Sequence, residues 1–169
     1  RVLGDERLFQ EKAAEQVERL NSRHFQVLLT SCPHCYNVLK NEYPQFGGNY
    51  NVVHHSEFLH EMLWAGKLQP KIGPVRKAIY HDPCYLGRYQ KIYDAPREVL
   101  KAITGAEIME MKNAKEHSYC CGGGGGHFWM DLKKGERINN LRVKQAVEAG
   151  AETIVTGCAY CKQMLEDAV

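Results

Sequence analysis

Five of the seven cysteines follow one spaced pattern. Cys84 is followed after 35 residues by the adjacent pair Cys120 and Cys121, and after a further 36 residues by Cys158 and Cys161, which form a CxxC motif. Thiols confined to such an array are typical of ligands or redox groups rather than of core packing. Five thiolates exceed the four that a structural zinc ion needs. They suit an iron–sulfur cluster, whose several iron atoms each need a ligand.

The other two cysteines, Cys32 and Cys35, repeat only the last part of this pattern. Residues 25–39 and 152–165 both run from an apolar β-prone segment through a small residue and CxxC into a helical pattern, at an offset of 126 residues. This similarity predicts an internal duplication. Two thiolates cannot hold a four-iron cluster alone, so the pair is empty, shares a metal with a partner chain, or is completed by sequence before Arg1. The duplication favours the last alternative, and we expect an upstream Cys and CysCysGly there.

The residues around the cysteines favour anionic, metal-binding thiolates. Both CxxC motifs are predicted at strand-to-helix turns, where backbone N–H groups stabilise thiolate. Gly122 and Gly123 begin a run of five glycines that is predicted to bend round the cofactor and to direct N–H groups at it. The run lacks the Lys-Ser/Thr of a phosphate-binding loop. The nearby histidines remain open as ligands, proton carriers, groups that contact the ligands, or surface residues: His81, His117 and His127.

The elements that must position these groups alternate along the chain. Helices are predicted over about 6–20 and 137–149, over 56–66 with Ser56 as N-cap, and over 94–103 with Asp94 as N-cap and Pro96 in the first turn. Besides the two segments before the CxxC motifs, strands are predicted at 51–54, 78–81 and 106–111. Such alternation predicts an α/β fold with parallel-sheet βα units.

Composition argues against a nucleic-acid-binding protein and against a membrane-spanning chain. The 169 residues carry 22 basic and 20 acidic side chains, without a basic stripe, so no nucleic-acid partner is expected. No apolar stretch approaches the roughly 20 residues of a membrane span, and the first residues do not resemble a signal peptide. Clustered thiols indicate a reducing, cytoplasmic setting. Association with a membrane through a missing N-terminal part or a partner subunit stays open.

Three segments resemble the CCG (cysteine-rich) domain family: 81–88 (HDPCYLGR), 119–123 (YCCGG) and 156–161 (TGCAYC). That family includes heterodisulfide reductase B and D subunits and membrane-linked iron–sulfur oxidoreductases. The resemblance implies the tail of a first CCG repeat at 1–66, a linker at 67–77 and a complete second repeat at 78–169. It also implies that Cys84, Cys120, Cys121, Cys158 and Cys161 hold a [4Fe-4S] cluster of the noncubane type.

The resemblance further implies an oxidoreductase subunit that passes electrons between a flavoprotein and a quinone or a disulfide. The expected partners are a flavoprotein, a membrane haem or quinone-reactive subunit, and other iron–sulfur subunits. No acid–base residues of an independent active site are evident, so we do not expect the isolated chain to be catalytically complete. A second cluster or zinc at Cys32 and Cys35 stays open. The alternative for the whole chain is a zinc-stabilised structural or interaction domain, which the fifth cysteine and the glycine run disfavour.

Overall fold

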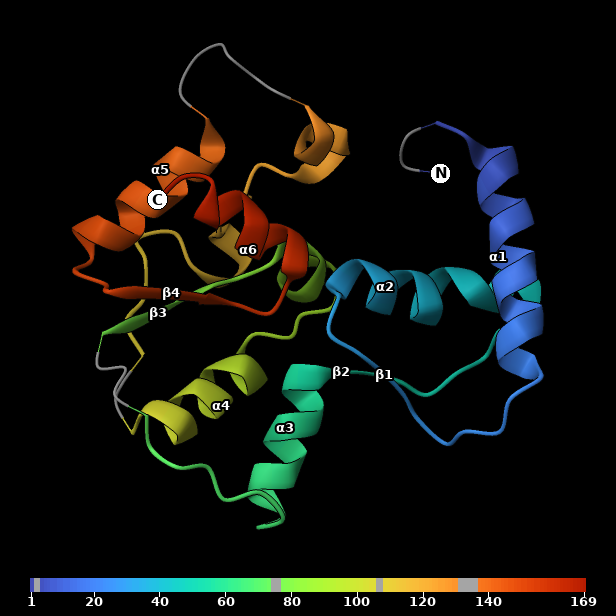
Figure 1. Ribbon diagram of the computed structural model, residues 1–169, viewed down its shortest axis with the longest axis horizontal. Coiled ribbons are helices and arrows are strands. Elements are labelled where there is room, and N and C mark those ends of the chain that lie inside the picture. The colour runs from blue at the N-terminus through green and yellow to red at the C-terminus, as the bar shows by residue number, and fades with distance from the viewer. Residues whose placement is uncertain (2–3, 74–76, 106–107, 131–136) are drawn as a thin grey trace.

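The computed structural model describes residues 1, 4–73, 77–105, 108–130 and 137–169. Within them the strands form two separate parallel pairs, each flanked by helices (Figure 1). β1 (Leu28–Thr30) pairs with β2 (Val52–His54), and β3 (Ala78–His81) pairs with β4 (Thr153–Thr156). A parallel pair needs a crossover connection between its strands, and helices supply both crossovers. The α/β class with parallel βα units is therefore confirmed.

Short helices surround the first pair. α1 precedes β1, a helical stretch joins β1 to β2, and α3 follows β2 directly. The joining stretch runs from an α-helix into a π-helical turn and then a 3-10 turn. The bounds are α1 Glu6–Asn21, α2 Pro33–Asn37, the π-helical turn Val38–Glu42, the 3-10 turn Tyr43–Phe46 and α3 His55–Trp64.

The second pair has the longer crossover, from β3 to β4. It contains α4 and α5, and α6 begins shortly after β4, beyond Gly157 and Cys158. The bounds are the π-helical turn Tyr85–Tyr89, α4 Asp94–Thr104, the 3-10 turns Lys115–His117 and Gly124–Trp129, α5 Ile138–Glu148 and α6 Ala159–Glu166.

Two predicted helix caps are wrong. The N-cap of α3 is His54, whose ring accepts a hydrogen bond from the Ser56 N–H, so Ser56 lies inside the helix. The N-cap position of α4 is Tyr93, and Asp94 is the first helical residue. The Asp94 carboxylate pairs with the Lys115 ammonium at 3.2 Å instead of capping its own helix. Pro96 does lie in the first turn of α4, as predicted.

Of the strand predicted at 106–111, the described residues 108–111 form a single bridge. Residues 106–107 lie outside the described part of the chain. Met109 pairs with Ile79 of β3 as an isolated parallel bridge, and its N–H donates to the Ala78 oxygen. The backbone then leaves the strand, and the main-chain oxygen of Asn113 accepts a hydrogen bond from Arg142.

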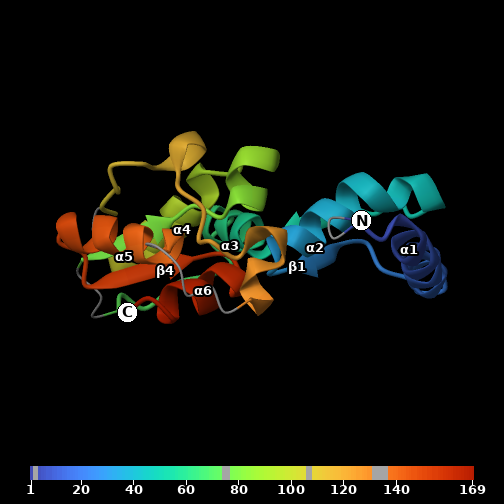
Figure 2. The same ribbon diagram turned by 90° about the horizontal axis from the view of Figure 1, so that it is seen from above.

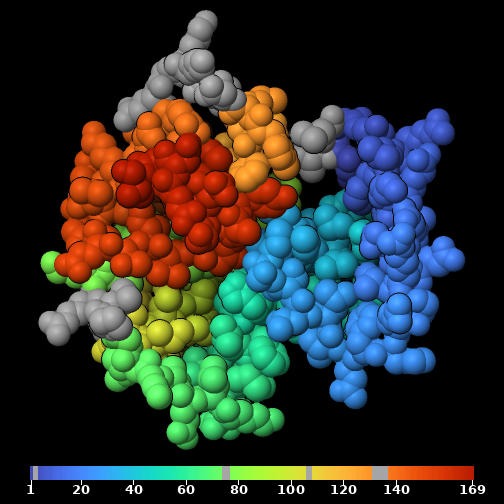
Figure 3. All heavy atoms as spheres, viewed as in Figure 1, coloured from blue at the N-terminus to red at the C-terminus, as the bar shows by residue number. Residues whose placement is uncertain are grey.

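The two strand pairs are joined by helix packing. α3 packs against α4, and α2 contacts the π-helical turn that follows Cys84. Figure 2 shows α1 at one end of an elongated molecule and α5 near the other, with α2 between them. Figure 3 shows the N-terminal segment in close contact with the rest of the chain. Among the described residues, no helix is both long and apolar enough to cross a membrane. The predicted boundaries 1–66, 67–77 and 78–169 stay a prediction.

Candidate metal centre

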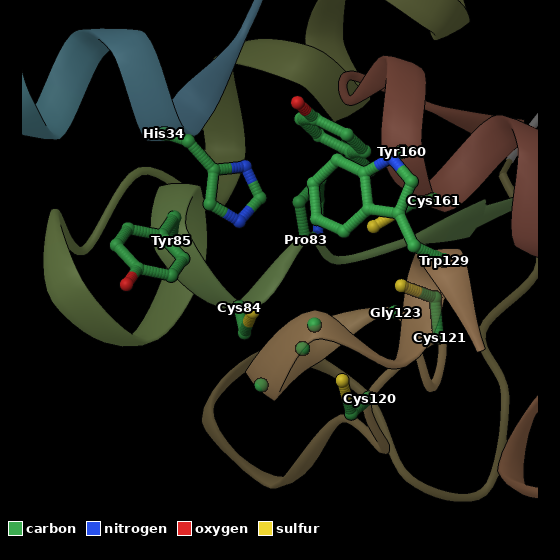
Figure 4. Close-up of a pocket in the computed structure, with 13 residues that line it drawn as sticks. His34, Pro83, Cys84, Tyr85, Cys120, Cys121, Gly123, Trp129, Tyr160 and Cys161 are labelled. Atoms are coloured by element: carbon green, nitrogen blue, oxygen red, sulfur yellow. The ribbon is translucent and has the colours of Figure 1, made fainter. Parts of the chain in front are cut away.

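Four cysteines from three distant segments line one cavity of about 250 Å³. They are Cys84, Cys120, Cys121 and Cys161, and their side chains surround the cavity in Figure 4. Backbone and aromatic groups complete the wall: His34, Pro83, Tyr85, Gly123–Gly126, Trp129 and Tyr160. Cysteines that the sequence separates by up to 77 positions therefore line one cavity.

The strand ends place these thiols. Cys84 lies just beyond β3, where the π-helical turn begins, and Cys161 lies in the first turn of α6 just beyond β4. Since β3 and β4 are parallel neighbours, their carboxyl ends lie at the same edge of the pair. Cys120 and Cys121 reach this edge on the loop before the 3-10 turn.

The fifth thiol of the pattern, Cys158, is buried at the N-cap position of α6 and is not part of the cavity wall. Hydrogen bonds from Cys161 and then from His34 lower the pKa of Cys158 to about 5. Cys158 is thus adjacent to the four-thiol group and suited to be a thiolate. Whether these five residues are ligands stays a prediction.

Cys32 and Cys35 lie on the other strand pair. Cys32 is the residue before α2, which confirms the predicted strand-to-helix turn, and Cys35 is exposed within that helix. Neither thiol lines the cavity. The structure therefore keeps this pair separate from the four-thiol group.

Gly122 and Gly123 shape the loop around the adjacent cysteine pair. Gly122 has a φ of +89°, which side chains rarely allow, and its N–H donates to the Cys120 sulfur at 3.3 Å. A Cβ on Gly123 would lie 3.1 Å from Cγ of Met164 and 3.7 Å from the Cys121 sulfur. Gly122 is therefore favoured by its backbone conformation, and Gly123 by the close neighbours that a side chain would meet.

The thiols of the centre differ in the direction in which their pKa values are shifted. Hydrogen bonds from Cys121 and Cys84, and then from the Gly122 and Gly124 N–H groups, hold the pKa of Cys120 far below its usual range. Donation to Cys120 raises the pKa of Cys84 far above its ordinary value and the pKa of Cys121 to about 11. Such a set supplies thiolate readily when a cation replaces the shared protons.

His34 links the first CxxC motif to this centre, and the sequence did not predict it as a site residue. Its ring lies 4.2 Å from the Tyr85 ring and 5.2 Å from the Tyr160 ring, measured between centroids. Hydrogen bonds with Cys158 and then Cys32 raise the pKa of His34 to about 9. Its position inside a CxxC motif was the available signal, but its contact with Tyr85 depends on the tertiary fold.

The residues before Cys84 anchor the centre to α4. The Asp82 carboxylate is buried and accepts two hydrogen bonds from the Arg97 guanidinium, at 2.7 and 2.9 Å. It also accepts one from the Lys115 N–H at 2.8 Å. Pro83 is buried beside the cavity. This bidentate pair fixes the chain direction from which Cys84 enters the site.

Arg142 anchors the centre to α5. It is fully buried, and its guanidinium donates to His81 Nδ1 at 3.0 Å, to the Asn113 oxygen at 2.6 Å and to Ser118 Oγ at 3.0 Å. Burial lowers the pKa of Arg142 to about 10, which still leaves it charged at neutral pH. Its positive charge beside the thiol group favours bound anions.

The three histidines considered from the sequence have different surroundings. His81 is buried, and one of its ring nitrogens and the sulfurs of Cys121 and Cys161 lie within 4.8 Å of one another. His117 is 80% exposed and pairs with Glu116, and His127 is exposed as well. Only His81 of the three is therefore in a position to act on the centre.

These residues fit an iron–sulfur cluster. The donor set is soft thiol, the cavity is lined by four such groups, glycine backbone surrounds the adjacent pair, and the buried Nε2 atom of His81 has no protein partner among the described residues.

Several curated proteins are similar to the chain over nearly its whole length. Identity is 46% with the probable iron-sulfur-binding oxidoreductase FadF of Bacillus subtilis (99% of this chain, 24% of the relative). It is 43% with the EtfAB:quinone oxidoreductase of Syntrophomonas wolfei (100% and 24%). It is 35% with a CoB–CoM heterodisulfide reductase subunit of Methanosarcina barkeri (93% and 39%). The chain spans about a quarter of the first two relatives.

A family model described as Cysteine-rich domain, CCG, matches residues 1–40 and 78–166. The match includes all seven cysteines and omits residues 41–77, which lie between the two matched stretches. It confirms the resemblance drawn from the HDPC, CCG and CxxC segments. The chain therefore belongs to the CCG cysteine-rich domain family.

Proposed function

We propose that this chain holds a [4Fe-4S] cluster of the noncubane type and transfers electrons within a larger oxidoreductase. The observation that carries the proposal is the convergence of Cys84, Cys120, Cys121 and Cys161 on one cavity, with Cys158 beside them. The names of the relatives FadF and EtfAB:quinone oxidoreductase support iron–sulfur electron transfer.

In this proposal the five cysteines are the cluster ligands, and Gly122 and Gly123 are cofactor-binding residues through their backbone. Bound there, the cluster would supply one-electron transfer. The chain's own residues would fix its position: Arg97 through Asp82, and Arg142 through Ser118, hold the two segments that carry Cys84 and Cys120.

The cavity mouth supports exchange with a partner. The rings of Tyr85, Trp129 and Tyr160 line it, and Trp129 is 69% exposed. Exposed aromatic groups of this kind are common at protein interfaces. We propose a flavoprotein as electron donor, and a quinone-reactive or membrane haem subunit, or a disulfide, as acceptor. Other iron–sulfur subunits are further candidate partners. We further propose a cytoplasmic location, with membrane association through a partner.

We assign Cys32 and Cys35 to a second site, completed by residues outside this chain. The pair offers two thiols, and the four-thiol cavity does not include them. His34 belongs to the first CxxC motif and lines the four-thiol cavity, and both Cys158 and Cys32 raise its pKa. A cluster or a zinc ion at this second site would be a close neighbour of the first.

Iron, sulfide and zinc analysis of the full-length protein, purified without oxygen, tests the proposal. We expect iron and sulfide with visible absorption, and Cys161→Ser should remove the iron of one site. Cys35→Ser is the matched comparison: it should leave the iron of the Cys84–Cys161 site in place and remove only metal at the second site. Zinc without sulfide, or full iron and sulfide in Cys161→Ser, would overturn the proposal in favour of a zinc-stabilised domain or a different ligand set.

A further inference from the structure

The buried Nε2 atom of His81 has no hydrogen-bond partner among the described residues. His81 is 1% exposed, so water does not replace the missing partner at the surface. The sulfurs of Cys121 and Cys161 and a ring nitrogen of His81 lie within 4.8 Å of one another. An unpaired buried polar atom in a well-packed region calls for a ligand or a functional explanation.

The hydrogen bond at Nδ1 of His81 determines which of the two ring nitrogens carries the proton. Nε of Arg142 lies 3.0 Å from Nδ1 of His81, and a guanidinium nitrogen can only donate. Nδ1 is therefore the acceptor. A neutral imidazole that accepts at Nδ1 carries its hydrogen on Nε2. Burial and the positive charge of Arg142 lower the pKa of His81 to about 3, in agreement with a neutral ring.

Arg142 cannot easily turn away from this contact. Its NH1 donates to the Asn113 oxygen at 2.6 Å and to Gln145 Oε1 at 2.8 Å, and its NH2 donates to Ser118 Oγ at 3.0 Å. These bonds hold the guanidinium plane, and with it the acceptor role of His81 Nδ1. The N–H at Nε2 is therefore available to an acceptor bound at the neighbouring thiol group.

This arrangement disfavours metal coordination by His81. A ligating Nε2 must offer its lone pair, and the proton of a neutral ring would then sit on Nδ1. Two donors, Nδ1–H and the Arg142 Nε–H, would face each other at 3.0 Å. A hydrogen bond from Nε2 to sulfur has no such conflict.

We propose that His81 is a positioning residue that donates its Nε2–H to sulfur in the metal centre, at Cys121, Cys161 or a cluster sulfide, with Arg142 fixing its tautomer. The inference rests on the proposed function and deepens it. Hydrogen bonds to sulfur stabilise the more negative, reduced state of a cluster and so raise its reduction potential. His81 would thereby set the potential without being a ligand.

Replacement of His81 tests the role in the assembled protein. His81→Phe in the full-length protein, prepared without oxygen, should keep the iron and sulfide content and lower the reduction potential. His81→Gln, which restores an N–H group, should recover part of the potential. Pulsed EPR of the reduced wild type, with ¹⁵N-labelled histidine, should show weak nitrogen coupling and an exchangeable proton. Iron loss as severe as in Cys121→Ser, or ligand-sized nitrogen coupling, would show coordination. An unchanged potential with a lower melting temperature would show a purely structural role. Either result would overturn the proposal.

A second measurement does not depend on any cluster. Two-bond ¹⁵N–¹H NMR of the metal-free protein should report the Nε2–H tautomer for His81, and Arg142→Met should add the Nδ1–H form. Ser118→Ala is the control, because it removes one Arg142 contact and leaves the His81 contact. If the wild-type His81 ring carries its proton on Nδ1, the proposal for His81 is wrong, even if the protein purified without oxygen contains iron and sulfide. If the proton is on Nε2 but the purified protein contains no iron, the proposed function is wrong and the tautomer assignment stands.

Discussion

The ring of His54 donates a hydrogen bond to the main-chain oxygen of Gly157, 103 residues later in the chain, at 3.2 Å. Its Nδ1 accepts from the Ser56 N–H at the start of α3, so Nε2 carries the proton. His54 is fully buried at the end of β2, and Gly157 directly precedes Cys158. This bond ties the first strand pair to the CxxC turn of the second.

Gly157→Ala should destabilise the protein by about 1–3 kcal/mol, measured by urea unfolding. A Cβ at Gly157 would lie 3.1 Å from the Tyr80 hydroxyl oxygen and 3.2 Å from Cε1 of His54. Both neighbours are buried and have little room to move. Gly73→Ala is the control, since a Cβ there meets no atom within 4 Å. Equal stability of the two variants would contradict the close packing at Gly157.

Stability should fall as the pH is lowered from about 6.5 to about 4. Burial, and then the charge of His55, lower the pKa of His54 from 6.5 to about 4 in the folded protein. The unfolded chain therefore binds more protons in this window, and the contribution of His54 to stability, full above pH 6.5, declines by about 3 kcal/mol. His54→Gln should make the slope of unfolding free energy against pH shallower. The same slope in both proteins would assign the pH dependence to other groups.

Arg97→Met should cost about 3–5 kcal/mol, because it leaves the Asp82 carboxylate buried without its charged partner. The two side chains are 11% and 2% exposed. Lys77→Met is the comparison: it breaks the pair with Glu152, in which both partners are more than half exposed, and should cost less than about 1 kcal/mol. Chemical unfolding of both variants at neutral pH measures the difference. Similar losses would mean that Asp82 regains its hydrogen bonds from other donors.

Cluster binding should stabilise the fold as well as serve electron transfer. Ligands from three distant segments cross-link β3, the loop at Cys120 and α6, so part of the binding free energy is folding free energy. Cys121→Ser should lose most of the iron of this site and melt several degrees lower, and chelation of iron from the wild type should give a similar shift. Calorimetry checks both. A variant that loses all its iron and keeps its melting temperature would show that cluster binding and folding stability are not coupled.

Local patterns in the sequence predicted much of this protein. The apolar periodicity before each CxxC indicated the helices that the structure has at Glu6–Asn21 and Ile138–Glu148, and the β-prone run at 78–81 predicted β3 with the same bounds. The spacing of the cysteines indicated the family. Each of these signals depends on residues close in sequence or on fixed spacings, since helix and strand periods repeat within a few positions.

Local patterns failed where a polar side chain had a choice of partners. Ser56 and Asp94 are ordinary N-cap residues by type, but His54 caps α3 and Asp94 pairs with Lys115. In the strand expected at 106–111, the described residues 108–111 form only the Met109 bridge. Capping and pairing depend on which competing donor or acceptor is nearby, and only the tertiary fold decides that.

The sequence by itself determined which residue types are available for the chemistry: a thiol array with glycines beside the adjacent pair. Only the tertiary structure decided how they are held. It placed His34 of the first CxxC on the cavity of the other four thiols, and Arg142 behind His81, 61 residues apart. Such contacts have no period and no fixed spacing, because they arise when packed helices and parallel strands bring distant segments to one edge.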